Sequence, residues 1–302
     1  MTSCKDCLPH HDESALTVII PIYNEHDSVE PLVKRLKEIT ASADYPLCWV
    51  IVDDGSDDGT EKKLAAVDEP SIHIVRQHQN RGYGAALKRG IRLAQSEYVA
   101  IADGDGTYPL ERLSEFFQKA RDNELDMVVG ARTGANVHIP LIRRPAKWCL
   151  RQLANYLSGT VIPDLNSGLR LMRRNTVLEY VSILPDGFSF TTTITLAMLC
   201  NDYAVEFLPI DYHQRQGHSK IRPIRDTLNF IQLICRTVLY FKPLRIFVPL
   251  SLCLVLLAFT VLAVTHYGLG RATDVTFGVI FMSAVQMFAV GLLADMLAKR
   301  SR

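Results

Sequence analysis

Val99-Ala-Ile-Ala-Asp-Gly-Asp-Gly-Thr-Tyr-Pro109 is an apolar run that ends in two aspartates separated by one glycine. Such a run is typical of a strand buried in a sheet, and Asp and Gly are common in the turn after a strand. A buried strand that ends at Asp103 and Asp105 would bring two carboxylates to a sheet edge, where a hard cation carrying phosphate oxygens can be held. Taken alone, the stretch fits both a plain turn and a metal-assisted diphosphate site.

Further strands are predicted on both sides of this stretch. Apolar, β-branched runs fit buried strands at residues 16–23, 48–52, 72–75 and 126–132. Between them, helices are predicted at residues 29–39, 61–67 and 81–90. Strands and helices that alternate with short links predict a doubly wound α/β fold with a mostly parallel sheet, which binds ligands outside the carboxyl ends of its strands. The acidic clusters at residues 53–58 and 103–105 lie at such ends.

Gly82-Tyr83-Gly84 opens the third predicted helix and resembles part of a dinucleotide-binding fingerprint. Leu87 stands where that fingerprint needs its third glycine, and the unit is not the first in the sheet, so we do not predict an oxidoreductase. We expect these glycines instead to let a loop approach a phosphate or the sheet closely.

The composition excludes few classes of protein. The 302 residues carry a formal net charge of +1, which gives no indication of nucleic-acid binding. Seven scattered cysteines and an N-terminus without an apolar signal run predict reduced thiols and a cytoplasmic catalytic part. Cys4 and Cys7, followed by two histidines, could form a small metal clip, but a disordered tail at residues 1–15 is the simpler expectation.

Four segments after residue 140 are predicted to associate with a membrane. Basic and apolar residues are mixed in helices predicted at residues 142–157 and 221–243, which is typical of helices at a membrane surface. Runs at residues 246–264 and 275–297 carry almost no charge, and each is long enough to cross a bilayer. We therefore expect residues 244–302 to form a two-helix transmembrane anchor.

Basic residues flank this anchor at both of its outer ends. Lys242 and Arg245 precede the first span, and Lys299 and Arg300 follow the second. The positive-inside rule then places the catalytic domain and both termini in the cytoplasm. Small residues in the second span could also support a homo-oligomer through the transmembrane helices, namely Gly278, Ser283, Ala284 and Gly291.

Two polar segments after residue 160 carry further candidate residues. Asp164 and Arg170 flank a small polar turn beside an apolar strand. Residues 212–220 combine His, Arg and Lys side chains around a glycine. This second segment is either a phosphate clamp that could close over a ligand or an ordinary solvated basic loop.

Five motifs together resemble those of the family 2 glycosyltransferases of the GT-A type, at residues 18–25, 51–60, 102–109, 166–172 and 215–220. Within that family the chain most resembles the polyprenyl-phosphate hexosyltransferases, which use dolichyl or undecaprenyl phosphate. The resemblance covers residues 16–222 and implies a GT-A catalytic domain at residues 16–220. It implies transfer of a hexose from a nucleotide sugar, linked to either UDP or GDP, to a polyprenyl phosphate.

The resemblance also implies roles for residues at matching positions. The base and ribose of the nucleotide sugar would be held by Pro21, Tyr23, Glu25 and Asp53. Mg2+ or Mn2+ would be held against the diphosphate by Asp103 and Asp105, with Thr107 near the position of a third ligand in some relatives. Donor or acceptor phosphates would be bound by Arg132, Arg144 (or its neighbour Arg143), Arg170, Arg215 and Lys220.

The chemistry of such a transfer fits these residues. The leaving diphosphate gains negative charge, which a divalent ion at Asp105 would stabilise. A lipid phosphate is already an anion near pH 7, so it needs positioning by arginines more than deprotonation, and its attack opposite the leaving group inverts the anomeric carbon. Asp164 is the candidate base or acceptor-orienting group, because residues 191–193 are threonines where many relatives have an acidic pair.

Two alternatives remain at this point. One is a membrane glycosyltransferase that acts on another lipid or on a polysaccharide, although the chain lacks the Gln-x-x-Arg-Trp motif and the additional spans common in polymerising enzymes. The other is a membrane scaffold on a degenerate glycosyltransferase fold. That alternative predicts loss of the metal carboxylates, yet Asp103 and Asp105 are both present.

Overall fold

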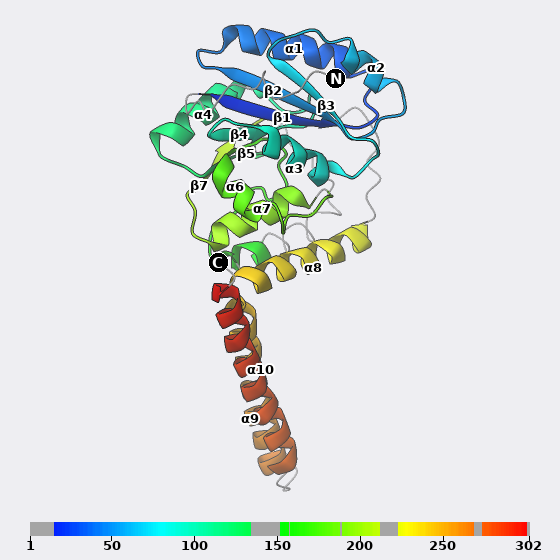
Figure 1. Cartoon of the computed structure of the whole chain (residues 1–302). Coiled ribbons are helices and arrows are strands. Elements are labelled where there is room, and N and C mark those ends of the chain that lie inside the picture. The colour runs from blue at the N-terminus through cyan, green and yellow to red at the C-terminus, as the bar shows by residue number, and fades with distance from the viewer. Residues whose placement is uncertain are drawn as a thin grey trace.

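The computed structural model describes residues 15–133, 152–156, 158–187, 189–211, 223–268 and 274–300. A layered α/β domain forms one end of the molecule, helix α8 (Pro223–Phe241) runs across its base, and two long helices project away from it (Figure 1). The tail predicted at residues 1–15 lies outside the described residues except for Ala15. That residue is 1% exposed and already belongs to the core.

One seven-stranded sheet organises the domain, in the order β3-β2-β1-β4-β6-β5-β7. Strand β6 runs antiparallel to β4 and β5, and the other neighbours are parallel. The prediction of an α/β fold with a mostly parallel sheet is therefore confirmed. The strands are β1 (Leu16–Ile22), β2 (Leu47–Asp53), β3 (Ile72–Arg76), β4 (Tyr98–Ile101), β5 (Met127–Ala131), β6 (Arg170–Arg173) and β7 (Val205–Pro209).

Helices cover both faces of the sheet because the apolar side chains of each strand alternate between two cores. On β1, Val18 and Ile20 belong to one core and Ile19 to the other. The first core is closed by α1 (Val29–Ser42), α2 (Thr60–Ala65) and α4 (Leu113–Asp122), which follows a short 3-10 turn, η1 (Leu110–Arg112). The second is closed by α3 (Tyr83–Leu93), α6 (Arg174–Tyr180) and α7 (Phe190–Cys200).

Helix α7 is buried along its whole length because it packs on two sides. Ile194 and Met198 belong to the core beneath the sheet, whereas Leu196 and Ala197 pack with α8 in a third apolar cluster. From α8 this cluster receives Ile234, Val238 and Phe241. Helix α7 therefore ties α8, which leads directly into the projecting helices, to the centre of the α/β domain.

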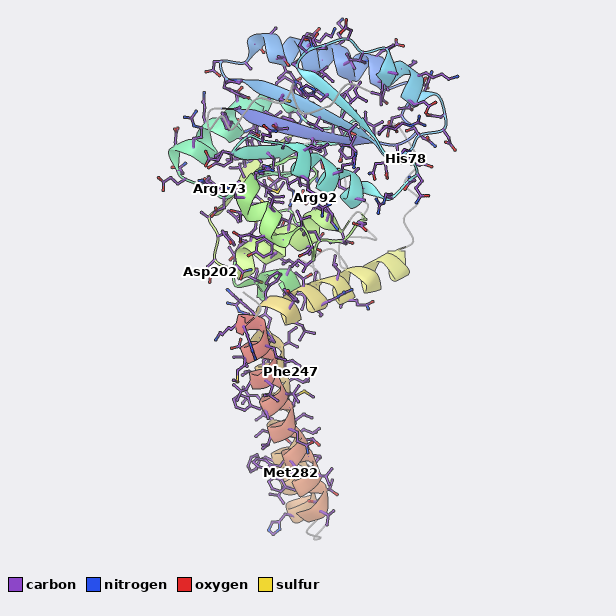
Figure 2. The ribbon with its side chains drawn as sticks, in the orientation of Figure 1. His78, Arg92, Arg173, Asp202, Phe247 and Met282 are labelled. Atoms are coloured by element: carbon purple, nitrogen blue, oxygen red, sulfur yellow. The ribbon has the colours of Figure 1, made fainter. Side chains whose placement is uncertain are left out.

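The projecting helices α9 (Leu244–Ala263) and α10 (Asp274–Arg300) pack against each other as a hairpin, with a π-helical turn, η3 (Val264–Gly268), at the end of α9. Segments Leu244–His266 and Val275–Arg300 are long and apolar enough to cross a membrane, and few of their side chains are buried. Met282 lies well along the hairpin and Phe247 near the domain (Figure 2), and α10 returns toward the domain.

The hairpin uses some of its small residues within one chain. A Cβ at Gly291 would lie 2.5 Å from the Cβ of Phe247, and Ala284 is 1% exposed. Both positions are therefore covered within the single chain. Ser283 is exposed, and a Cβ at Gly278 would meet nothing within 4 Å. Among the small residues predicted to support an oligomer, these two keep an open surface in the described hairpin.

Candidate active site

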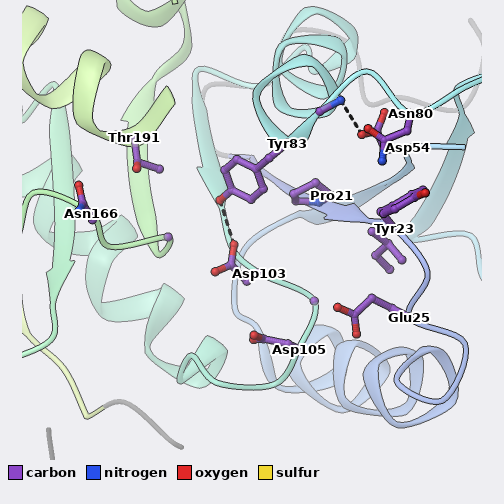
Figure 3. Close-up of a pocket in the computed structure, with 14 residues that line it drawn as sticks. Pro21, Tyr23, Glu25, Asp54, Asn80, Tyr83, Asp103, Asp105, Asn166 and Thr191 are labelled. Atoms are coloured by element: carbon purple, nitrogen blue, oxygen red, sulfur yellow. Dashed lines mark hydrogen bonds between the residues drawn. The ribbon is translucent and has the colours of Figure 1, made fainter. Parts of the chain in front are cut away.

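A pocket of about 580 Å³ lies outside the carboxyl ends of β1, β2 and β4, where a doubly wound sheet binds its ligands. One wall is formed by residues that follow these strands or begin α3, and the opposite wall comes from the segment before β6 and from the start of α7 (Figure 3). The lining residues are Pro21, Ile22, Tyr23, Glu25, Asp54, Asn80, Gly82, Tyr83, Asp103, Gly104, Asp105, Asn166, Gly168 and Thr191.

Hydrogen bonds between the loops after β1 and β2 hold Tyr23 and Glu25 at the pocket. Asn24 has a positive φ of 53°, which Asn tolerates better than most residues. Its side chain exchanges hydrogen bonds with Asp57, donating to the carboxylate at 2.9 Å and accepting from the backbone N–H at 3.0 Å. The backbone N–H of Glu25 donates to the hydroxyl of Thr60. Tyr23 remains 44% exposed at the rim, so a flat base could stack on it.

Asp53 and Asp54 occupy different environments at the end of β2. Asp53 is one of the predicted nucleotide contacts, but it is 1% exposed and does not line the pocket. Its carboxylate accepts a hydrogen bond from the N–H of Ser56 and lies 3.6 Å from the guanidinium of Arg76. Asp54 lines the pocket, and its two oxygens accept from the N–H groups of Arg81 and Gly82, each at 2.8 Å. Asp54 therefore holds the loop before α3 at the pocket edge.

Asp103 and Asp105 both line the pocket, as expected for residues after β4. The hydroxyl of Tyr83 donates to Oδ1 of Asp103 at 2.9 Å (Figure 3). Carboxylate oxygens suit Mg2+ or Mn2+. In the described part of the chain no cluster of three or more His, Cys, Asp or Glu side chains surrounds them. The donor set thus fits an ion whose remaining ligands come from a diphosphate and water.

Thr107 has a different role from the predicted third ligand. Its hydroxyl donates to Oδ1 of Asp105 at 2.6 Å, and its backbone N–H donates to the same oxygen at 3.2 Å. Thr107 is 2% exposed and does not line the pocket. In this arrangement it orients the Asp105 carboxylate and does not itself offer an oxygen to an ion.

Asp164 is paired with Arg132 beside the pocket and does not line it. The side chain of Asp164 is 5% exposed and that of Arg132 is 22% exposed. Burial alone would raise the pKa of Asp164, but hydrogen bonds from Arg132 and from the N–H of Asn166, together with the arginine charge, hold that pKa below its usual value. A carboxylate in this state is a weak base, so the structure favours the acceptor-orienting alternative for Asp164.

The guanidinium of Arg170 does not face the pocket as a phosphate ligand would. It is fully buried and donates to the carbonyls of Ser167 and Thr191, at 2.6 and 2.8 Å, and to the hydroxyl of Thr195. Burial lowers its pKa to about 10, which still leaves it charged at neutral pH. In this arrangement the guanidinium binds protein groups and does not face a phosphate in the pocket. Arg170 instead joins the segment before β6 to the start of α7.

Three predicted phosphate ligands lie outside the described residues, namely Arg144, Arg215 and Lys220. The whole basic segment at residues 212–220 lies outside them as well. Of the basic helix predicted at residues 142–157, the structure describes a helical piece at residues 152–156. The proposed roles of these three residues therefore remain predictions.

Sequence reasoning missed Tyr83, Asn166 and Thr191 as pocket residues. Tyr83 stands between Gly82 and Gly84, the two glycines that resemble part of a dinucleotide-binding fingerprint. Asn166 is fixed by the hydroxyl of Thr192, which donates to its side-chain oxygen at 2.6 Å. The threonines at residues 191–193 indicated an uncharged segment in the sequence. That Thr191 and Asn166 line the same wall of the pocket follows only from the packing of α7 against the segment before β6.

Residues 17–180 match the family model described as glycosyl transferase family 2, which is more than half of the chain. The chain belongs to glycosyl transferase family 2. Residues 242–299 match a second family model, the GtrB C-terminal hairpin, which covers α9 and α10. The two long apolar helices of this family 2 enzyme therefore correspond to a recognised hairpin, which supports its assignment as a membrane protein.

Curated relatives share between a quarter and a third of their residues with this glycosyltransferase. Dodecaprenyl-phosphate galacturonate synthase of Rhizobium johnstonii is 26% identical over 94% of this chain and 88% of the relative. Undecaprenyl-phosphate mannosyltransferase of Micrococcus luteus is 27% identical over 67% of this chain and 86% of the relative. Polyprenol monophosphomannose synthase of Mycolicibacterium smegmatis is 29% identical over 68% of this chain and 80% of the relative.

Solved structures show the same fold. Glucosyl-3-phosphoglycerate synthase from Mycobacterium tuberculosis, in complex with Mn2+, UDP and phosphoglyceric acid, has a TM-score of 0.57 at 16% identity, over 74% of this chain and 78% of the other. The same protein with Mg2+ and UDP has a TM-score of 0.55 at 17% identity, over 74% and 79%. The fold of this family 2 glycosyltransferase is therefore the one predicted from its motifs.

Proposed function

We propose that this family 2 glycosyltransferase transfers a hexose from UDP- or GDP-sugar to a membrane polyprenyl phosphate, with inversion at the anomeric carbon. The observation that carries the proposal is the link between pocket and hairpin. The first turn of α7 lines the pocket with Thr191, while the rest of α7 packs on α8, which leads into the two apolar helices. A lipid acceptor held in a bilayer would thus lie within reach of the pocket.

The donor is proposed to lie along the wall formed after β1 and β4. Pro21, Tyr23 and Glu25 would contact the base and ribose, and Asp53 would support them from beneath the loop. Asp103 and Asp105 would hold Mg2+ or Mn2+ against the diphosphate. When bound, that ion would stabilise the negative charge that develops on the leaving diphosphate.

The acceptor phosphate is proposed to bind near Arg132. Asp164 holds the guanidinium in one orientation through two hydrogen bonds, so the arginine is preorganised for an anion. Arg144, Arg215 and Lys220 are proposed to complete the acceptor site. A phosphate monoester is already ionised near neutral pH, so positioning at this site, without a general base, accounts for attack on the sugar.

The membrane orientation is also a proposal. Lys242 and Arg245 lie at the start of the hairpin, and Lys299 and Arg300 lie at the end of α10, which returns toward the domain in Figure 1. Both basic ends therefore lie at one side of the proposed bilayer, the cytoplasmic side by the positive-inside rule. A fluorescent protein fused after Arg302 should fluoresce in bacterial cells, whereas alkaline phosphatase at the same point should be inactive. The reverse result would overturn this orientation.

The transfer can be tested with membranes that contain the full chain. They would be incubated with each of a set of radiolabelled UDP- and GDP-sugars, polyprenyl phosphate and Mn2+. We expect one donor to label the organic phase, and Asp105→Asn to remove that label. Asp27→Asn is a matched control, because its carboxylate is fully exposed on the loop after β1 and does not line the pocket. Label in a polymer, or in no product with any donor, would overturn the lipid-phosphate acceptor.

A further inference from the structure

We infer that Tyr83 is a positioning residue for the metal ion, because its hydroxyl fixes the carboxylate of Asp103 in the orientation that an ion in the pocket requires. This inference rests on the proposed metal site. Tyr83 and Asp103 both line the pocket, and the tyrosine hydroxyl donates to Oδ1 of Asp103 at 2.9 Å (Figure 3). Carboxylates that bind metals are commonly held in this way by a hydrogen bond from a neighbouring side chain.

The backbone of Tyr83 is held rigidly by its two glycine neighbours. A Cβ at Gly84 would lie 2.2 Å from the carbonyl oxygen of Pro185, and a Cβ at Gly82 would lie 2.6 Å from that of Asp186. The first turn of α3 therefore packs backbone against backbone on the segment before α7. The N–H of Ala85 donates to the carbonyl of Asp186 at 3.0 Å and completes this contact. The glycines thus serve the placement of the tyrosine between them.

The carboxylate of Asp103 is restrained from its other side by Gly168. A Cβ at Gly168 would lie 2.8 Å from Oδ2 of Asp103, so the backbone there passes very close to the carboxylate. Gly168 is itself held by Tyr108, whose hydroxyl accepts its N–H at 2.7 Å. With Tyr83 on Oδ1 and Gly168 beside Oδ2, the carboxylate has little room to rotate. The carboxylate is therefore held in one orientation at the pocket.

The hydroxyl of Tyr83 can be removed without removing its ring. Phenylalanine would keep the ring and its packing but would leave Asp103 without this donor, so a Tyr83→Phe change separates orientation from packing.

The test measures Mn2+ binding to the full chain in detergent by electron paramagnetic resonance, with UDP or GDP present to supply the diphosphate and with the same nucleotide without protein as the reference. We expect Tyr83→Phe to raise the Kd for Mn2+ about tenfold, the lower end of the range for losing such a supporting hydrogen bond. Tyr98→Phe is the matched control, because it removes a buried hydroxyl from the opposite end of β4. It should leave Mn2+ affinity unchanged. An unchanged Kd in Tyr83→Phe would overturn the inference.

A further variant separates failure of this inference from failure of the proposed site. Asp103→Asn should abolish Mn2+ binding if Asp103 is a ligand. If Asp103→Asn weakens binding and Tyr83→Phe does not, the inference about Tyr83 is wrong and the metal site stands. If Asp103→Asn binds Mn2+ as tightly as the unmodified chain, the assignment of the site is itself wrong, and the inference falls with it.

Discussion

The carboxylate of Asp164 accepts two side-chain hydrogen bonds from Arg132, at 2.7 Å from Nε to Oδ2 and 3.0 Å from Nη2 to Oδ1. The backbone N–H of Arg132 adds a third at 3.2 Å. Both side chains are largely buried, so the pair is held in one geometry. Arginine and carboxylate planes that meet in this bidentate way fix direction as well as charge. The pair therefore holds the guanidinium in one orientation, and the proposed acceptor site at Arg132 depends on that orientation.

The first prediction concerns the dependence of the rate on pH. The lowered pKa of Asp164 keeps its carboxylate ionised throughout the range from about pH 5 to 8. Because no general base titrates there, Asp164→Asn should lower kcat/KM for the lipid phosphate by about 10–100-fold without changing the shape of the pH–rate profile. Initial rates across this range check the prediction. An inflection that disappears in Asp164→Asn would show instead that Asp164 acts as a base.

The second prediction concerns stability in acid. The pKa of Asp164 is lower in the folded chain than its unfolded value of about 3.9, so its contribution is fully present above about pH 4. The contribution is lost as the pH falls through the lower, folded value. Compared with Asp164→Asn, the unmodified chain should therefore lose its stability advantage below about pH 4. Thermal unfolding from pH 3 to 7 measures the difference, and a constant difference would contradict the assigned shift.

The third prediction uses two glycines near the pocket. A Cβ at Gly168 would lie 2.8 Å from Oδ2 of Asp103, whereas a Cβ at Gly187 would meet nothing within 4 Å. Gly168→Ala should therefore displace the carboxylate and raise the concentration of Mn2+ needed for half-maximal activity by about tenfold. Gly187→Ala should leave it unchanged. If both variants need the same concentration of Mn2+ for half-maximal activity, displacement of the Asp103 carboxylate does not weaken metal binding and the prediction is wrong.

Much of one pocket wall was predictable because it follows from the ends of strands. Pro21, Tyr23, Glu25, Asp103 and Asp105 all line the pocket, since parallel strands bring the residues at their carboxyl ends to one edge of the sheet. The doubly wound fold was likewise visible as apolar, β-branched runs that alternate with helical patterns, and the two long apolar helices as uncharged runs.

The rest of the site depends on contacts that no local pattern encodes. Adjacent residues of a strand point in opposite directions, so the motif alone could not show that Asp54 lines the pocket while Asp53 is buried beneath it. Arg170 could not be distinguished from a phosphate ligand, because its burial results from packing between β6 and α7. Tyr83 reaches Asp103 only through the packing of α3 on the segment before α7.

The fourth prediction concerns the buried guanidinium of Arg170. In Arg170→Met the carbonyl of Ser167 would lose the hydrogen bond from Arg170, at about 1–3 kcal/mol for an acceptor left unpaired. The carbonyl of Thr191 would lose its bond from Arg170 but keep the one that it accepts from the hydroxyl of Thr195. Arg170→Lys should also be destabilised, because a single ammonium cannot reproduce the planar fork. Thermal unfolding of the full chain in detergent measures both. If both variants are as stable as the unmodified chain and only acceptor binding is weakened, the structural role is wrong and Arg170 is a phosphate ligand.

The fifth prediction separates packing within the hairpin from association between chains. Gly291→Ala would place a Cβ 2.5 Å from the Cβ of Phe247, which a rotation of the ring cannot relieve, so the hairpin should lose about 1–3 kcal/mol. Gly278→Ala meets no neighbouring atom and should be neutral or slightly stabilising, since alanine favours a helix.

Thermal unfolding in detergent compares the two variants. Phe247→Gly, which removes the Cβ at that position, combined with Gly291→Ala should show a coupling energy between these positions. Gly278→Leu then tests the exposed surface of the hairpin around Gly278 and Ser283. If copies of the chain associate through it, this variant should lower the oligomer fraction in cross-linking while leaving the unfolding temperature of the hairpin unchanged. A drop in oligomer fraction with Gly291→Ala alone would mean instead that the surface between α9 and α10 is shared between chains, because only then would a residue facing Phe247 control association.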